Sequence, residues 1–198
     1  VWVVGSRVYR GSGSNWTEIE GEHERLEDVV VAPDGKVFAV GDGIYELGER
    51  IEPVVHPLTE DDFSDVWARA PDDVHAITYE TRKLAHFDGE AWTLEDTPVV
   101  GGATAVHGFG EVLFVGSTNG LWGRGEGAWT RMMEAGRTGL SIGGEGPDTV
   151  VVGDREGRVH RRDGDAWTVI RSAAPESAVT SLARIGENDY LVAGRRLF

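Results

Sequence analysis

Cysteine is absent from this 198-residue sequence. The chain can therefore form no disulfide, hold no cysteine-based metal site and offer no thiol nucleophile. Long apolar runs are also missing, since none approaches the ~20 residues that a helix needs to cross a bilayer, and no charged segment followed by an apolar stretch marks a signal peptide. We expect a soluble protein without membrane insertion, with the cytoplasm favoured. Because the sequence opens at Val1 in the middle of a pattern, we also expect that residues precede it.

Lysine is scarce as well. Of the 19 basic residues only Lys36 and Lys83 are lysines and the other 17 are arginines, while 34 acidic residues bring the net charge to −15. This charge disfavours a nucleic-acid backbone or an anionic membrane surface as a partner. Dispersed acids with arginine in place of lysine are typical of halophile proteins, whose self-repulsion is screened by concentrated salt. We expect a haloarchaeal source; the alternative is an ordinary acidic protein from a high-GC organism.

Helical patterning is missing, because no long run rich in leucine and alanine occurs. Instead the sequence holds 28 glycines against 7 prolines, with frequent valine and tryptophan, and 40% of its residues are hydrophobic. This composition favours many short strands joined by tight turns around a folded core. The fold class that we predict is all-β.

A repeat of about 38 residues runs along the chain. Its marker is a turn followed by Trp-Thr, found at Trp16, Trp92, Trp129 and Trp167, with a degenerate copy at Ile51. Successive markers are 35, 41, 37 and 38 residues apart. A fixed period of this length indicates a repeat architecture.

Each unit carries a second landmark upstream of the tryptophan, an apolar run that ends at or near glycine. Examples are residues 1–5, 37–41, 112–116, 150–153 and 190–194. Near-continuous apolar runs bounded by Gly and Asp are typical of strands that are buried on both faces. We expect these strands to lie between neighbouring sheets.

One unit shows the expected pattern of four strands and their turns. Strands are predicted at 64–69, 74–79, 84–87 and 91–94, with turns at 71–73 and 88–89. Asp-Gly pairs at 34–35, 88–89 and 163–164 supply the positive φ that tight hairpins need.

Four antiparallel strands per unit form the blade of a β-propeller. We predict a single β-propeller domain over residues 1–198, built from four-stranded antiparallel blades. The count of about 22 candidate strands favours six blades with an incomplete first and last blade. Five blades with a spare hairpin is the alternative.

The repeat resembles that of the BNR-like and photosystem II stability/assembly factor-like propellers, on the segment Val-Trp-Val-Val-Gly at 1–5 and the recurring Asp-Gly-x-x-Trp-Thr. The resemblance covers essentially the whole chain and implies the fold rather than a function. The turn is also similar to the Asp-box of sialidases, but Asp88 and Asp163 stand directly before Gly and four residues before Trp. An Asp-box is structural, so we predict that the tryptophans form core between blades.

Motifs for catalysis or metal binding are missing. The six histidines show no zinc-helix spacing, and no phosphate-binding loop, nucleophile elbow or dinucleotide-binding unit occurs. We therefore predict no metal and no cofactor, and we expect His75, His86, His107 and His160 on strands to be packed or edge-facing residues rather than ligands. The loops at 41–43 and 153–157 lack an EF-hand ladder of ligands and are predicted to be plain turns.

In an antiparallel blade, the turns between second and third strands and the connections between blades emerge at one face. We expect function to gather there, on loops whose sequences diverge between the repeats. The candidate binding residues on this face are His56, Glu60, Asp61, Asp62, Arg82, Lys83, Asn119, Arg137 and Arg155. Asp72, Asp73 and Glu145 are expected on the opposite face.

The function that we predict is a non-enzymatic protein-interaction or scaffolding module with a protein partner. The alternative is a glycan-binding protein or a sialidase-like hydrolase that acts at the channel mouth. A sialidase-like site needs three converging arginines and a tyrosine nucleophile, and the tyrosines all fall on predicted strands. The alternative would be favoured if three or more face loops brought arginines and carboxylates into one pocket.

Overall fold

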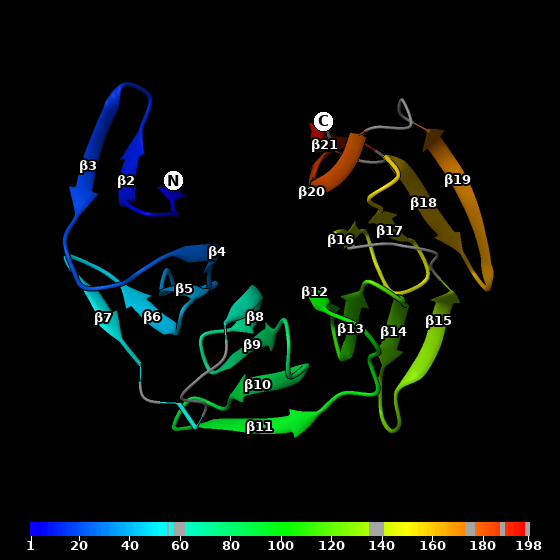
Figure 1. The fold of residues 1–198 in the computed structure, drawn as a ribbon, viewed down its shortest axis with the longest axis horizontal. Helices are drawn as coiled ribbons and strands as arrows, with labels where there is room; N and C mark the ends of the chain where they lie inside the picture. Colours follow the sequence, from blue (N-terminus) through cyan, green and yellow to red (C-terminus); the bar gives the residue numbers. More distant parts are fainter. Residues whose placement is uncertain (55, 58–61, 135–140, 173–176, 187–188, 197–198) are drawn as a thin grey trace. The chain divides into compact units, whose positions relative to one another are not determined.

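A computed structural model describes residues 1–54, 56–57, 62–134, 141–172, 177–186 and 189–196. Over these residues the structure consists of β-strands without a helix (Figure 1), and accordingly no helix in this part of the chain is long and apolar enough to cross a membrane. Neighbouring strands pair antiparallel in every sheet, in chain order. The prediction of an all-β chain is confirmed.

The chain divides into two compact units at Thr97. Three sheets make up the first unit, in chain order. They are β1 (Trp2–Val3), β2 (Val8–Ser12) and β3 (Asn15–Ile19); β4 (Leu26–Val31), β5 (Val37–Gly41), β6 (Ile44–Leu47) and β7 (Ile51–Pro53); and β8 (Phe63–Ala70), β9 (Asp73–Thr78), β10 (Lys83–Phe87) and β11 (Trp92–Asp96).

The second unit begins at Pro98 and also contains three sheets. They are β12 (Ala103–Phe109), β13 (Val112–Ser117), β14 (Gly120–Arg124) and β15 (Thr130–Glu134); β16 (Ser141–Gly144), β17 (Val150–Gly153), β18 (Arg158–Asp163) and β19 (Ala166–Ser172); and β20 (Ser177–Gly186) with β21 (Asp189–Arg196).

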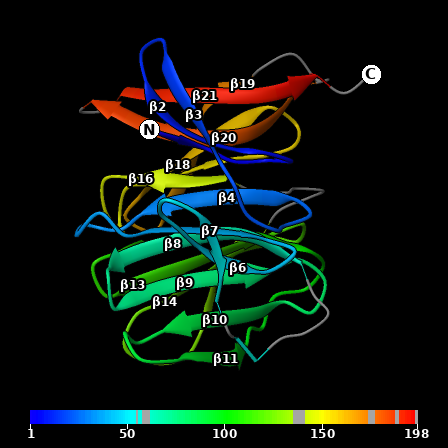
Figure 2. The same ribbon diagram turned by 90° about the vertical axis from the view of Figure 1, so that its left-hand side faces the viewer.

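The sheet β8–β11 tests the predicted strands directly. Figure 2 shows its four strands in chain order, and their bounds differ from the predicted ones by one or two residues. One assignment was wrong: Asp73 was placed in the turn, but it is the first residue of β9 and is buried. The turn is therefore shorter than predicted, and the buried carboxylate of Asp73 lies on the strand that follows it.

The predicted Asp-Gly turns are confirmed by the backbone. Gly35, Gly89 and Gly164 have φ angles of 93°, 95° and 62°, in the positive-φ region that favours glycine. In the β10–β11 turn the Asp88 carboxylate also accepts hydrogen bonds from the backbone N–H groups of Glu90 at 3.0 Å and Ala91 at 2.9 Å. These bonds lower the pKa of Asp88. The Asp-Gly pair thus serves the turn, as the resemblance to an Asp-box implied.

The core lies between neighbouring sheets. All five residues of β5 are buried, as expected for a strand covered on both faces. Trp92 on β11 meets Phe38 on β5 edge to face, with ring centroids 6.3 Å apart, and Trp167 donates its indole N–H to the carbonyl of Met132 on β15 at 3.0 Å. The prediction that the tryptophans pack between sheets therefore holds for these two.

Trp16 departs from that prediction. It occupies the same place in the repeat, but it is 44% exposed and donates its indole N–H to the carbonyl of Gly13 in its own hairpin, at 2.9 Å. The repeat fixes the hairpin position of a tryptophan, whereas its burial depends on what lies against the sheet.

Glycine at the end of the second strand has a specific packing reason. The first strands β4, β8, β12 and β20 each carry a β-bulge near their start, opposite the end of the second strand. A Cβ on Gly41 would lie 2.0 Å from the Arg25 carbonyl oxygen, and one on Gly194 would lie 2.3 Å from the Ala178 carbonyl oxygen. The repeated glycine therefore makes room for the bulged strand.

Replacing Gly41 by alanine is expected to destabilise the chain by about 1–3 kcal/mol, because a methyl group would be forced against backbone atoms. Gly48→Ala is the matched control, since a Cβ there meets no atom within 4 Å and alanine at such a site stabilises by up to ~1 kcal/mol. Urea denaturation of both variants measures the difference. If the two variants have the same free energy of unfolding, then the close contact at Gly41 does not contribute to stability.

Candidate functional site

The connections between sheets and the turns between second and third strands meet at the same end of a sheet, as predicted. The backbone N–H of Tyr79, just after β9, donates to the carbonyl of Asp62 in the connection before β8, at 3.1 Å. In the second unit the N–H of Thr118 donates to the carbonyl of Gly102 in the same way, at 2.9 Å. We call this end of each sheet its turn end.

A buried polar side chain at the end of the second strand holds each of these turns. Thr78 accepts a hydrogen bond from the backbone N–H of Lys83 at 2.9 Å, and Ser117 accepts one from the N–H of Asn119 at 3.1 Å. Both hydroxyls are fully buried. The turn backbones are therefore fixed from inside, while Arg82 at the tip of the β9–β10 turn is exposed.

The structure brings two predicted binding regions of the first unit together. Asp62 lies beside the β9–β10 turn, where Arg82 is exposed and has a φ of 58°. Lys83 is less available, because its ammonium pairs with Asp96 across β10 and β11. His56 packs edge-on against Phe63, and burial lowers its pKa, so it is neutral near pH 7.

In the second unit Asn119 and Arg155 occupy the corresponding turns of two different sheets. Arg155 is exposed, whereas Asn119 is half-buried and its carbonyl accepts a hydrogen bond from Arg131 at 2.8 Å. The remaining predicted residues, Glu60, Asp61 and Arg137, lie outside the described residues.

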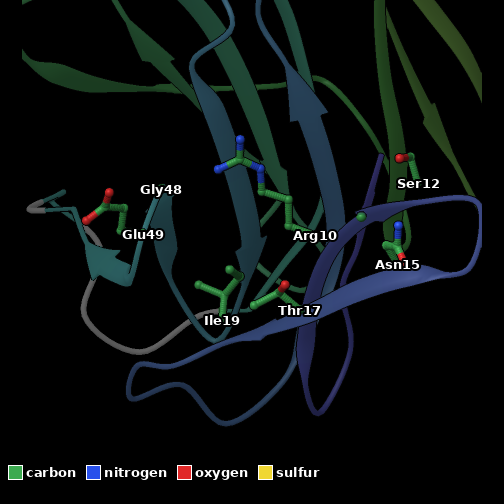
Figure 3. A pocket seen from close by; sticks show the side chains of 8 residues that line it. Arg10, Ser12, Asn15, Thr17, Ile19, Gly48 and Glu49 are labelled. Atoms are coloured by element: carbon green, nitrogen blue, oxygen red, sulfur yellow. The ribbon is translucent and has the colours of Figure 1, made fainter.

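A pocket of about 400 Å³ lies between the β2–β3 hairpin and the β6–β7 turn (Figure 3). It is lined by Arg10, Gly11, Ser12, Asn15, Thr17, Ile19, Gly48 and Glu49. Its charged groups are one arginine, Arg10 on β2, and one carboxylate, Glu49 in the β6–β7 turn. The sialidase-like alternative requires three loops that bring arginines and carboxylates together, and this pocket does not supply them. It lies at the opposite end of the sheets from the turn ends, where the first-to-second and third-to-fourth turns are found; we call this the hairpin end.

The surroundings of Tyr45 also disfavour a sialidase-like hydrolase. Its hydroxyl donates to Asp42 at 3.1 Å, and burial together with the negative charge of Asp42 raises its pKa to about 12. A tyrosine nucleophile needs the opposite shift, because the phenolate is the reactive form. Tyr45 therefore serves to brace its turn.

Of the histidines on strands, His107 packs against an aromatic side chain, whereas His75, His86 and His160 each lie 2.9 Å from an aspartate oxygen. The ring of His107 lies 4.8 Å from that of Phe109, centroid to centroid. Burial lowers its pKa to about 4, so it is a neutral core residue.

A different polar cluster lies at the hairpin end of the sheet β8–β11. Asp73 follows the β8–β9 turn, and His86 is the second-last residue of β10, before the β10–β11 turn. These two turns touch, since a Cβ on Gly89 would lie 2.7 Å from the Cβ of Asp72. The cluster is thus at the opposite end of the sheet from Arg82.

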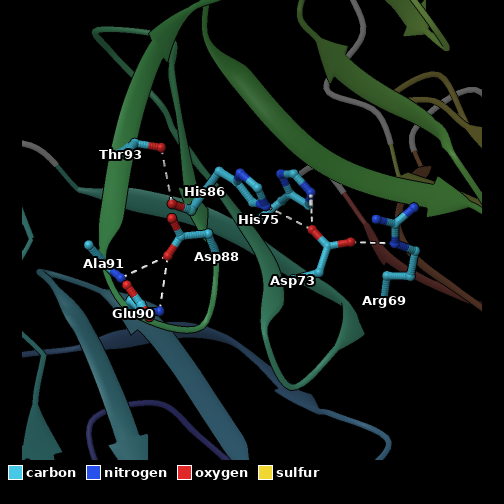
Figure 4. Close-up of polar contacts among 8 residues, drawn as sticks. All are labelled: Arg69, Asp73, His75, His86, Asp88, Glu90, Ala91 and Thr93. Atoms are coloured by element: carbon cyan, nitrogen blue, oxygen red, sulfur yellow. Dashed lines mark hydrogen bonds and ion pairs between the residues drawn. The ribbon is translucent and has the colours of Figure 1, made fainter.

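Strand register assembles a row of rings in this cluster. His75 on β9 is paired with Trp67 on β8 and with His86 on β10. Its ring stacks on both, with centroids 5.8 Å from Trp67 and 4.3 Å from His86. We call Asp73, His75 and His86 the Asp-His-His cluster (Figure 4).

The carboxylate of Asp73 is the centre of the cluster. Its Oδ1 lies 2.9 Å from Nε2 of His75 and 2.9 Å from Nε2 of His86, and its Oδ2 pairs with the guanidinium of Arg69. Burial by itself would raise the pKa of Asp73, but His75, the hydrogen bond from His86 and the charge of Arg69 outweigh it and lower the pKa. Asp73 is therefore a carboxylate at neutral pH.

A related cluster in the second unit has one histidine. Asp154 is fully buried, and its Oδ1 accepts the backbone N–H groups of Glu156 and Arg158, each at 2.9 Å. Its Oδ2 accepts Nε of Arg158 at 2.7 Å and Nε2 of His160 at 2.9 Å. Burial raises the pKa of Asp154, but these hydrogen bonds outweigh it and lower the pKa. The donors come from Glu156 in the turn after β17 and from Arg158 and His160 on β18. Asp154 therefore ties this turn to the strand that follows it.

Sequence reasoning missed the Asp-His-His cluster. The histidines have no zinc-helix spacing, Asp73 falls in a predicted turn, and His75 and His86 fall on predicted strands, so no pattern pointed to a cluster. The usable signal was the hairpin register: Ile77 pairs with Leu84 across the β9–β10 turn, so His75 must pair with His86.

No protein-family profile and no curated protein matches the sequence, but solved structures match the fold. Virginiamycin B lyase from Staphylococcus aureus is similar with a TM-score of 0.81 and 12% identity, over 95% of this chain and 70% of that one. YCF48 from Cyanidioschyzon merolae is similar with a TM-score of 0.72 and 14% identity, over 98% of this chain and 76% of that one. The structure of YCF48 bound to D1 peptide is similar with a TM-score of 0.73 and 13% identity, over 98% of this chain and 71% of that one.

At these identities the likeness shows the fold alone. The chain has the β-propeller fold, as predicted, and four of the six sheets among the described residues have four antiparallel strands. The match to YCF48, a photosystem II assembly factor, agrees with the resemblance of the repeat. The chain spans about two thirds to three quarters of the lengths of these structures. The number of blades and the single domain stay predictions.

Proposed function

We propose that this chain is a protein-interaction module that binds a segment of a partner protein at the turn ends of its sheets. The observation that carries the proposal is the construction of the turns. Buried side chains such as Thr78 and Ser117 fix the turn backbones, while Arg82 and Arg155 stand exposed at the tips. Binding residues are commonly presented in this way, on loops held by a rigid scaffold.

The comparisons support the same class of function. YCF48 is a propeller of this fold that has been solved with a bound peptide, so the fold can present a peptide site. Because fold by itself does not determine function, the assignment to the turn ends depends on the geometry above. The halophilic, haloarchaeal origin stays a prediction from the composition.

Peptide selection tests the proposal without a known partner. A random peptide library is selected on the immobilised chain, and selected peptides are titrated against Arg82→Asn and Arg155→Ala. Asparagine suits position 82 because it tolerates the positive φ of 58° found there. We expect Arg82→Asn to weaken about tenfold the binding of peptides that use the first unit, and Arg155→Ala to do the same for peptides that use the second. A tenfold loss corresponds to ~1.4 kcal/mol, and stability should be unchanged within ~0.5 kcal/mol.

Two exposed residues at the hairpin end supply matched controls, Asp72→Ser and Glu90→Ser, which should bind as the parent does. Loss of binding in these controls, with Arg82→Asn unaffected, would mean that the partner uses the other end of the sheets. If the parent selects no peptide above background, or cleaves a sialoside, the proposal of a binding module is wrong.

A further inference from the structure

The Asp-His-His cluster has no part in the proposed function, since it lies at the hairpin end of its sheet. One ligand atom of each of its three residues lies within 4.8 Å of the other two, and Oδ1 of Asp73 is 2.9 Å from Nε2 of each histidine. Two imidazoles and one carboxylate are a donor set that zinc and related divalent transition metals prefer. We propose that Asp73, His75 and His86 form a zinc-binding site.

The distances are close to those of a zinc site. At zinc–ligand bonds of 2.0–2.2 Å, two ligands of a tetrahedral ion stand about 3.3 Å apart. The Oδ1 atom of Asp73 is 2.9 Å from each Nε2, so the carboxylate must withdraw by a few tenths of an ångström. The two rings are nearly parallel, at 5°, so one of them must also tilt to aim its lone pair at the ion.

The surroundings of the two rings decide which one tilts. His75 is held between Trp67 and His86, and its side chain is 12% exposed. The side chain of His86 is 39% exposed on a strand near the sheet end, so it has the freedom to turn. An ion can reach the site from the same side.

Arg69 supplies the outer support that metal-binding carboxylates usually have. Its guanidinium pairs with Oδ2 of Asp73 and leaves Oδ1 directed at the two imidazoles. Outer partners of this kind orient a ligand before the ion arrives. Arg69 also balances the carboxylate charge, so affinity depends on both imidazoles rather than on local negative charge.

The surroundings of Asp73 can hold a zinc ion, whereas those of Asp154 cannot. Both have a buried aspartate bonded to an arginine and to Nε2 of a histidine. Around Asp154 the other donors are backbone N–H groups, which cannot ligate a metal. Around Asp73 the second donor is another imidazole, which can. Three protein ligands also leave a coordination position open for water or another group.

Zinc titration of the full chain, after treatment with a chelator, tests the proposal. Isothermal titration calorimetry with zinc chloride should show one site per chain, and cobalt substituted for zinc should show visible d–d absorption. His86→Ala should weaken zinc binding by at least 10–100-fold, the loss seen even when outer partners of a metal site are removed. His86→Gln, which keeps a polar side chain, should lose affinity to the same extent.

His160→Ala is the matched control, because it removes an imidazole that is bonded to a buried aspartate in the same way but has no second imidazole beside it. It should bind zinc as the parent does. The proposal is overturned if the parent binds less than one zinc per chain, if both His86 variants bind as the parent does, or if His160→Ala loses as much affinity. None of these readouts involves a partner, so they do not depend on the proposed function.

Discussion

Replacing Trp92 by alanine is expected to lower the free energy of unfolding by about 3–5 kcal/mol, the cost of removing a buried aromatic side chain. Trp92 is 7% exposed, stacks on Phe87 at 5.3 Å and meets Phe38 edge to face at 6.3 Å. The substitution would leave a cavity between two sheets, and a domain has only about 5–15 kcal/mol to lose. Urea denaturation should show a lower midpoint, and the melting temperature should fall by roughly 10 °C.

Trp16→Ala provides the comparison at the same place in the repeat. Because Trp16 is 44% exposed and its indole bonds within its own hairpin, its loss should cost about 1 kcal/mol or less. If the two variants lose the same stability, then the difference in burial between the two tryptophans does not decide the energetics, and the core assigned between β4–β7 and β8–β11 is wrong.

Asp154→Asn is expected to destabilise the second unit by about 1–3 kcal/mol, the usual cost of leaving a buried hydrogen-bonding group unsatisfied, because Asp154 is buried although Arg158 is 36% exposed. An amide can accept hydrogen bonds through only one of its two positions, whereas both oxygens of Asp154 accept from N–H donors. The NH₂ group of the asparagine would therefore point at N–H donors, either those of the backbone or those of Arg158 and His160, and could not bond to them. Chemical denaturation at pH 7 measures the loss.

The pH dependence separates this charge effect from a loss of packing. The folded pKa of Asp154 is lowered, so its contribution is fully present above the unfolded pKa of about 3.9 and is lost as the pH falls through the folded pKa. The stability difference between parent and Asp154→Asn should then shrink below pH ~4. A difference that is constant with pH would contradict the role given to the ionised carboxylate.

Asp42→Asn is the matched control for Asp154→Asn. Asp42 follows the second strand of its sheet as Asp154 does, but it is exposed and accepts from the backbone N–H of Glu24 and the hydroxyl of Tyr45. An amide oxygen can still accept such bonds, so the cost should be about 1 kcal/mol or less.

The sequence predicted the parts of the fold that depend on local backbone preference. The Asp-Gly pairs predicted positive φ, and Gly35, Gly89 and Gly164 have it. The alternation of apolar runs and turns predicted the strands of β8–β11 to within one or two residues. These features follow from a few neighbouring residues, because turn geometry and strand length are set within a single hairpin.

Other features required the tertiary structure, because they depend on residues far apart in the chain. The β-bulges that demand glycine at position 41 are visible only once the first and second strands are paired. Trp92 and Trp16 share one sequence pattern, yet only the packing of a neighbouring sheet decides that Trp92 is buried. Local sequence cannot determine burial, since burial is a property of the opposite surface.

The Asp-His-His cluster shows the same division most clearly. The sequence placed His75 and His86 on two strands of one hairpin, which is as far as local patterns reach. Their stacking, and the direction of both Nε2 atoms toward Oδ1 of Asp73, depend on cross-strand register and on the tight turn that makes Asp73 the first residue of β9. A shift of one residue in register would have turned one of the imidazoles to the other face of the sheet. The sequence by itself therefore determined the repeat, its turns and its strands, while the paired and packed sheets decided which side chains meet.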